Sequence, residues 1–173
     1  MRIQVNTVSL SWFEKRTRAN DICKVTMADV HSKEVRSYNM SRIKGKNTKP
    51  EILVRKYLFS KGFRYRINVK TLPGKPDIVL SKLKTVIFVN GCFWHGHKGC
   101  RYFVIPKTRT EWWSAKIQKT KFRDEEKYNQ LKQLGWKILI VWECLLKPAV
   151  RDATLSEIEH SIFRFKIEKS KAQ

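Results

Sequence analysis

DIVLSKLKTVIFVN, residues 77–90, contains two strongly apolar segments, DIVL at 77–80 and TVIFVN at 85–90. Turn-forming residues precede the first segment, and polar residues separate the two. Short apolar runs bounded in this way are typical of buried β-strands. Before them, FRYRINV at 63–69 alternates in the manner of a half-buried strand. The sequence therefore predicts three consecutive strands at the centre of the fold.

Helical patterns flank these strands. Thr48 and Glu51 have the spacing of a capping box and begin a helix that ends at Gly62, and Thr108 and Glu111 repeat that spacing. The other elements expected are a short basic helix at 32–42, a long helix at 109–134, a buried strand at 137–144 and an amphipathic helix at 156–169. This order predicts an α/β domain of two or three layers, in which helices cover a mixed sheet.

The charge of the chain indicates its partner. Its 173 residues include 37 Lys and Arg against 15 Asp and Glu, a formal net charge of +22. A field of this size favours a polyanion, nucleic acid first. An ordinary basic surface or an anionic membrane are the other interpretations, but no apolar run approaches the ~20 residues of a spanning helix. We expect a nucleic-acid-binding protein without a membrane segment.

The length fits one domain of ordinary size. A regular pattern begins at Met27, which we take as a candidate natural start. We expect a flexible extension at 1–26, a single domain at 27–168 and a fraying tail at 169–173. The N-terminus lacks the apolar stretch of a secretory signal, so export is not expected.

A cluster of cysteines and histidines predicts a metal site. Cys92, His97 and Cys100 have the spacing C-x4-H-x2-C, which a loop can wrap around an ion, and Cys144 offers a fourth donor. Zinc in structural sites takes four such donors. Pairing of Cys92 with His95 is an alternative, and another is that the cysteines are small buried residues. Because the chain is not a short secreted one and these cysteines stand with histidines in a metal-like pattern, we expect a reducing compartment and treat the remaining Cys23 as incidental.

Asp77 is the first candidate for chemistry. It follows Pro76, which presents the carboxylate at the end of a strand. With Glu51 nearby on the preceding helix, it provides the minimum ligands for Mg²⁺. The alternatives are a turn-forming role for Asp77 and a capping role alone for Glu51.

Residues 27–147 resemble the very-short-patch repair (Vsr) endonuclease family. The words that carry the resemblance are MADVHSKEVRSYNM, LPGKPDIVL, VIFVNGCFWHGHKGC, PKTRTEWW and ILIVWEC, in that order and at matching distances. It implies a restriction-endonuclease-like PD-(D/E)xK fold with a structural zinc site. The implied activity is nicking of double-stranded DNA at a T·G mismatch left by deamination of 5-methylcytosine.

The resemblance also implies roles for individual residues. Asp77 matches the aspartate that binds Mg²⁺, with a second contact from the backbone carbonyl of Val89, and His95 matches the general base that activates water. Asp124 matches an acid near the site, although pairing with Arg123 or Lys121 is an equally simple account. The residues that match the structural zinc ligands are Cys92, His97, Cys100 and Cys144.

DNA contacts follow from the same resemblance. Phe93, Trp94 and Trp113 resemble an aromatic wedge that enters the duplex beside the mismatch, and Met40 resembles a residue that intercalates from the minor-groove side. Core packing is the alternative for each aromatic, and we expect it for Trp112, Trp136 and Trp142. Asn90 and Thr120 depart from the residues that family members carry, which puts phosphate or water contacts in doubt.

The implied partners are DNA with a T·G mismatch, and mismatch-repair proteins and a DNA polymerase acting downstream. The implied location is the prokaryotic cytoplasm, at the nucleoid. We expect a monomer, because the lesion has no two-fold symmetry. The competing hypotheses are a zinc-stabilised DNA-binding module without catalysis and a nuclease of broader specificity.

Overall fold

The structure is a computed structural model that describes residues 32–171. The expected extension at 1–26 and the start at Met27 lie outside the described residues. In chain order, the helices and strands are α1 (Lys33–Ser41), α2 (Lys49–Ser60), β1 (Arg66–Ile67), β2 (Ile78–Leu80), β3 (Thr85–Asn90), α3 (Thr110–Gln133), β4 (Lys137–Trp142) and α4 (Arg151–Lys171). Short 3-10 helices follow β2 and β4.

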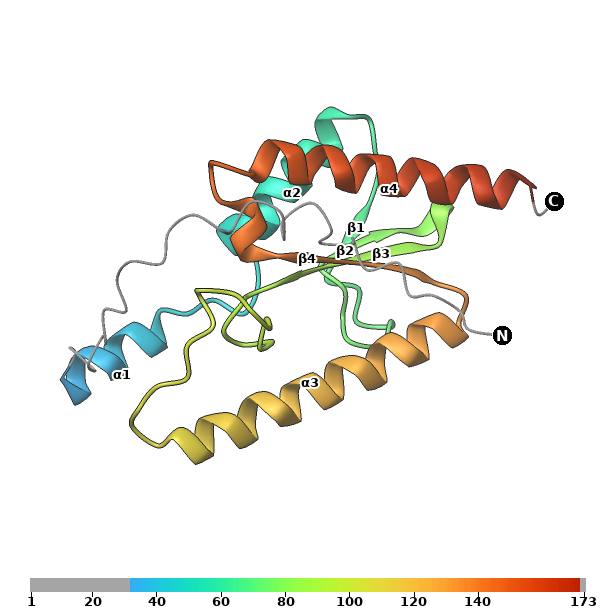
Figure 1. Ribbon diagram of the computed structural model, residues 1–173. Coiled ribbons are helices and arrows are strands. Elements are labelled where there is room, and N and C mark those ends of the chain that lie inside the picture. The colour runs from blue at the N-terminus through green and yellow to red at the C-terminus, as the bar shows by residue number, and fades with distance from the viewer. Residues whose placement is uncertain (1–31, 172–173) are drawn as a thin grey trace.

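The four strands form one mixed sheet in the order β1-β2-β3-β4 (Figure 1). β2 pairs antiparallel with both β1 and β3. β3 and β4 pair in parallel along their full length, from Thr85 opposite Lys137 to Asn90 opposite Trp142. α3 supplies the crossover that a parallel pair requires. The mixed sheet flanked by helices is thus confirmed.

The sheet is the middle of three layers. Side chains along a strand point alternately to opposite faces, so a strand that is apolar throughout can be buried on both. Ile78 and Ile87 belong to the core shared with α2 and α4, whereas Val79 and Phe88 belong to the core shared with α3. Figure 1 shows α3 on one side of the sheet and α2 and α4 on the other. The structure thereby decides between the two-layer and three-layer alternatives.

The predicted start of α2 is confirmed in detail. Thr48 Oγ1 accepts a hydrogen bond from the backbone N–H of Glu51, and the Glu51 carboxylate accepts one from the N–H of Thr48. This reciprocal capping box satisfies two N–H groups that have no partner inside the helix. The chain leaves the helix at Gly62, whose φ of +80° is strained for other residues.

The predicted strand at 63–69 is too long. Only Arg66–Ile67 pair with β2, and both are exposed at the edge of the sheet. Phe63 and Tyr65 instead pack against the core beneath α2 and α4, and Asn68 adopts a left-handed conformation, with φ of +47°, that ends the strand. Tertiary packing therefore overrides the alternating pattern.

The predicted capping box of α3 is wrong. The residue before the helix is Arg109, in a left-handed conformation, and its side chain makes no capping bond. Thr110 directs its hydroxyl to the carbonyls of Pro106 and Lys107 instead. The spacing alone did not distinguish a cap from a local turn.

Two boundaries at the C-terminal end also differ from expectation. The strand expected at 137–144 ends at Trp142, where a 3-10 turn takes over. The last helix begins at Arg151 rather than 156, and it continues through Lys171 into the range expected to be tail. Between residues 32 and 171, no helix has the length and apolar character needed to cross a membrane.

Candidate active site and metal centre

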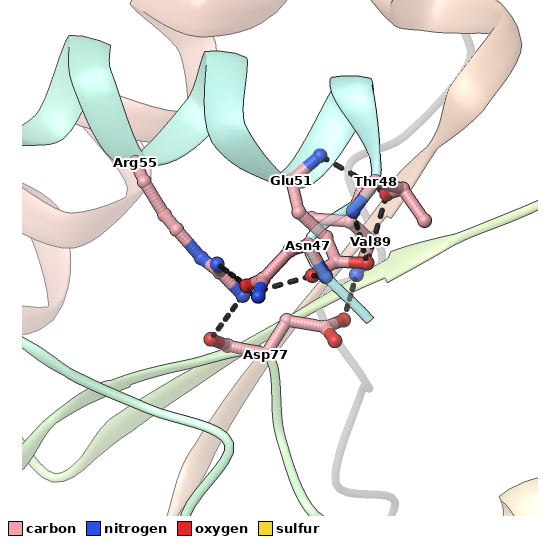
Figure 2. Close-up of polar contacts among 6 residues, drawn as sticks. All are labelled: Asn47, Thr48, Glu51, Arg55, Asp77 and Val89. Atoms are coloured by element: carbon pink, nitrogen blue, oxygen red, sulfur yellow. Dashed lines mark hydrogen bonds and ion pairs between the residues drawn. The ribbon is translucent and has the colours of Figure 1, made fainter. Parts of the chain in front are cut away.

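Asp77 lies at the start of β2, beside the end of β3. Its Oδ2 accepts a hydrogen bond of 2.8 Å from the N–H of Val89 (Figure 2). Antiparallel pairing of β2 and β3 brings these positions together although they are 12 residues apart. Burial raises the pKa of Asp77 to about 6, and the negative charge of Glu51 acts in the same direction. Burial, more than the neighbouring charges, therefore makes this carboxyl group hold its proton more tightly than usual.

Glu51 is occupied by protein donors. One carboxylate oxygen accepts from both N–H and hydroxyl of Thr48, and the other accepts from the N–H of Asn47 and from Arg55 (Figure 2). The side chain is buried and its four bonds engage both oxygens. This geometry supports the capping role of Glu51. Its remaining effect on the site is electrostatic, because its negative charge raises the pKa of Asp77.

Arg55 is a residue of the site that the sequence analysis missed. Its guanidinium donates to Asn47 Oδ1 at 2.7 Å, to Glu51 at 2.8 Å and to the backbone carbonyl of Asp77 at 3.4 Å. It is buried, and its charge balances that of Glu51, which would otherwise be very unfavourable there. The spacing of four residues between Glu51 and Arg55 on one helix was the available signal.

His95 and Asp124 form a close pair. His95 Nδ1 lies 2.6 Å from Asp124 Oδ2, with both side chains about one quarter exposed. An ionised carboxylate at this distance accepts a hydrogen bond from Nδ1–H, and in a neutral ring Nε2 is then the acceptor nitrogen. The expected alternative, pairing of Asp124 with Arg123 or Lys121, is not what the structure shows: Arg123 bonds to Thr120 and to a backbone carbonyl.

Asp77 and the His95–Asp124 pair interact through their charges. Two positive charges, those of Arg55 and His95, lower the pKa of Asp77 and partly offset the effects of burial and of Glu51. His95 therefore lies within electrostatic reach of Asp77, although it comes from the loop after β3. The Asp77 carboxylate and the His95 ring are thus close enough for their charges to interact.

The raised pKa of Asp77 predicts an unusual dependence of stability on pH. Because the folded protein holds this proton more tightly than the unfolded chain, its free energy of unfolding falls as the pH rises from about 4 through about 6. Asp77→Asn keeps an acceptor for Val89 but removes the charge. Without added Mg²⁺, this variant should be more stable than wild type by roughly 1–3 kcal/mol at pH 7.5 and by about a third of that at pH 4.5. Chemical denaturation at both pH values checks this, and an equal difference at both would contradict it.

Cys92, His97, Cys100 and Cys144 meet in one cluster. Their ligand atoms all lie within 4.8 Å of one another, and His97 Nδ1 is 3.6 Å from Cys92 Sγ and 3.4 Å from Cys144 Sγ. The indole of Trp142 stacks flat on the His97 ring at 4.1 Å. The alternative pairing of Cys92 with His95 is wrong, because His95 faces Asp124 instead.

The loop between the two histidines depends on Gly96. Its φ is +61°, and a Cβ there would overlap the side chain of Lys121 and lie 2.8 Å from Ile117 Cγ2. Any larger residue would push the loop away from α3. Gly96 thus allows His95 and His97 to point in different directions, one to Asp124 and one to the cysteines.

Aromatic rings gather beside this loop. The ring centroid of Phe93 lies 5.1 Å from that of Trp94 and 5.2 Å from that of Trp113, and the centroids of Trp94 and Trp113 are 6.2 Å apart. The ammonium of Lys116 lies over Trp94, Trp112 and Trp113. All three wedge residues are half-buried, in mutual contact rather than in the main cores.

Met40, expected at the DNA interface, and Trp112, expected in the core, are both exposed. Met40 is 44% exposed on α1, which lies apart from the sheet in Figure 1. Trp112, expected in the core, is 51% exposed, so that expectation is wrong. Its ring instead contacts Trp113 at 4.8 Å, because the first turn of α3 extends beyond the sheet. Trp136 packs against the core beneath α3, and Trp142 supports His97.

Asn90 and Thr120, which differ from the residues of the family pattern, both form hydrogen bonds within the protein. Asn90 is 4% exposed and donates to the hydroxyl of Tyr128 at 3.0 Å. Thr120 donates to the carbonyl of Lys116 in its own helix. Tyr128, like Arg55, was missed, although it stands one helical turn after Asp124.

Sequence comparisons with known proteins point to one family. The sequence model of the family described as DNA mismatch endonuclease Vsr matches residues 28–101. The nicking enzyme V.NmeAIP of Neisseria meningitidis is 52% identical over 121 residues, which cover 70% of this chain and 86% of that protein. The chain belongs to the Vsr family. The DNA mismatch endonuclease Vsr of Escherichia coli K12 is 46% identical over 133 residues, 76% of this chain and 85% of that protein.

A further Vsr relative is the nicking enzyme V.XorIIP of Xanthomonas oryzae, 48% identical over 120 residues, 69% of this chain and 88% of that protein. The region that matches the Vsr model includes Asp77, His95 and three residues of the cysteine cluster. Folding brings Asp124, from α3, to His95, and it brings Cys144, from the turn after β4, to the other three cluster residues.

Proposed function

We propose that this DNA mismatch endonuclease is Mg²⁺-dependent and nicks double-stranded DNA on the 5′ side of the thymine in a T·G mismatch. The observation that carries the proposal is the Asp77 carboxylate, fixed by Val89, with the His95–Asp124 pair within electrostatic reach. Family membership supplies the DNA substrate, and the net charge of +22 fits it.

The Asp77 site fits a hard divalent cation. Its carboxyl group is buried and has a raised pKa, which a bound cation would lower, and no hydrogen bond within the described part of the chain uses its Oδ1. Asp77 and the backbone carbonyl of Val89 would hold Mg²⁺, which prefers one or two carboxylates with waters and phosphate oxygens. When bound, the ion neutralises the charge that develops on the phosphate during hydrolysis.

His95 acts as the general base. Asp124 keeps the proton on Nδ1, so Nε2 accepts a proton from the attacking water as its oxygen forms the new bond to phosphorus. The bond from phosphorus to the 3′ oxygen breaks, and that oxygen takes a proton from solvent. The products are a 3′-hydroxyl and a 5′-phosphate. Asp124 also stabilises the imidazolium that forms, as the carboxylate of a catalytic triad does.

The cysteine cluster fits structural zinc. Three sulfurs and one imidazole nitrogen within 4.8 Å form the soft, four-donor set that Zn²⁺ prefers. Burial raises the pKa of Cys92 and of Cys144, which a bound cation would reverse. With four protein ligands zinc has no open position, so its role is to hold the loop that carries His95.

Recognition of the mismatch rests on the aromatic wedge and on Met40. Unstacking a base step requires a few kcal/mol, and least at a mismatch, so deformability becomes part of the selectivity. The exposure of Met40 and the position of Lys116 over the tryptophans support a surface that meets DNA.

The remaining proposals concern architecture and partners. We infer a PD-(D/E)xK-type fold, supported by Pro76–Asp77 at the start of β2 beside a mixed sheet. A single domain at 27–168 would act as a monomer in the prokaryotic cytoplasm. Mismatch-repair proteins and a polymerase would complete the repair of its nick.

The test uses two duplexes that differ only in one base pair, T·G or C·G, each with and without Mg²⁺. Wild type should nick the T·G duplex only with Mg²⁺, and should prefer it by on the order of 10²-fold. Omitting Mg²⁺ rather than adding a chelator keeps the zinc site intact. If both duplexes are bound but remain whole, the non-catalytic DNA-binding module is the correct hypothesis. Equal nicking of both would favour the nuclease of broader specificity.

A further inference from the structure

Asn90 lies at the end of β3, beside the residue whose N–H binds the Asp77 carboxylate. It is the last residue of the strand and directly follows that residue, Val89. Side-chain alternation sends Val89 toward α2 and α4, and Asn90 toward α3, the face of Val86 and Phe88. There its buried amide donates to the Tyr128 hydroxyl at 3.0 Å.

Tyr128 stands on the helix that holds the other half of the site. It lies four residues after Asp124, so both side chains share one face of α3. Its ring packs edge-on against Phe88 at 5.1 Å, which leaves the hydroxyl directed to Asn90. Burial, with smaller effects of the Asp124 and Asp77 charges, raises the pKa of Tyr128 to about 12. The phenol is therefore neutral at working pH and within electrostatic reach of both catalytic carboxylates.

The two halves of the catalytic site have separate supports. Asp77 and Val89 belong to the sheet, whereas Asp124 orients His95 from α3. We propose that the hydrogen bond between Asn90 and Tyr128 sets the position of α3 relative to the end of β3, and so the position of His95 relative to Asp77. Both are positioning residues for the nicking reaction, and the inference rests on the proposed function. In this interpretation Asn90, where the sequence departs from the family pattern, binds a residue inside the protein instead of a phosphate.

The test compares Tyr128→Phe, Asn90→Ala and the double variant. Each single change should lower the single-turnover rate constant on a T·G duplex at saturating protein and Mg²⁺ by about tenfold, because small displacements of reacting groups slow the chemical step strongly. The dissociation constant for the same duplex without Mg²⁺ should stay within about twofold of wild type. Because the two side chains act as one unit, the double variant should also lose about tenfold rather than about a hundredfold.

Tyr57→Phe is the matched control. It removes another tyrosine hydroxyl with a hydrogen bond, to Glu159 on α4, from the opposite layer of the domain. This variant should cleave at the wild-type rate. If wild type cleaves the duplex and Tyr128→Phe cleaves it at the same rate, this inference is wrong but the proposed function stands. The same conclusion follows if the two effects multiply in the double variant, or if the variants lose only DNA affinity. Absence of cleavage by wild type would instead overturn the proposed function, and this inference with it.

Discussion

Asp77→Asn should lower the single-turnover rate of nicking a T·G duplex by about 10³-fold or more while leaving DNA binding intact. The expected loss reflects the several kcal/mol that a metal ion contributes to phosphoryl chemistry. Asparagine preserves the shape of the side chain and an acceptor for Val89, so the fold should be retained. Rates come from a labelled duplex with Mg²⁺, and affinities from the same duplex without it.

Glu159→Gln is the control for this change, since it also converts a carboxylate to an amide. Glu159 binds Tyr57 and Lys61 on the opposite side of the sheet from His95, and its loss should not change the rate. His95→Ala should reduce the rate by about 10²–10⁴-fold, the usual contribution of a general base. Nicking by Asp77→Asn at the wild-type rate would exclude Asp77 as the metal ligand.

Cys144→Ser should deprive the protein of zinc and, with it, of activity. The proposed zinc would join the loop after β3 to the turn after β4, and metal-binding energy of this kind is folding energy. We expect less than one zinc per chain, a loss of stability of several kcal/mol and a fall in nicking of about 10²-fold or more as His95 loses its position. Elemental analysis, thermal unfolding and the nicking assay measure the three effects.

Cys23→Ser makes the matched control, because the metal hypothesis gives Cys23 no role. It should keep one zinc per chain and the wild-type rate. A Cys144→Ser variant with full zinc content and full activity would show that Cys144 is not a ligand. Wild-type protein that contains no zinc after purification would contradict the metal assignment as a whole.

Local sequence signals predicted the elements whose cause is local. β2, β3 and α2 follow from apolar runs and a capping box that act within a few residues. The failures lie where distant contacts decide. The strand at 63–69 is short because Phe63 and Tyr65 find a core on α4, and Trp112 is exposed because its turn of α3 extends past the sheet.

In the candidate site, too, the sequence indicated what lies within one segment and missed the contacts between distant segments. Cys92, His97 and Cys100 lie within one loop, so their spacing could indicate a metal site, whereas only the structure shows that His95 turns away from it to Asp124 on α3. Asn90 gave a signal only as a departure from a family pattern. Its partner Tyr128 is 38 residues away, and no local rule connects the two.

By itself, the sequence determined the order of the elements, the double burial of the central strands and the identity of the chemical groups, because propensity, periodicity and side-chain chemistry belong to short segments. Only the tertiary structure decided which groups meet. Antiparallel pairing brings Val89 to Asp77, and the parallel crossover through α3 brings Asp124 to His95 and Tyr128 to Asn90. These contacts depend on the packing of whole layers, in which burial and charge act between residues far apart in the chain.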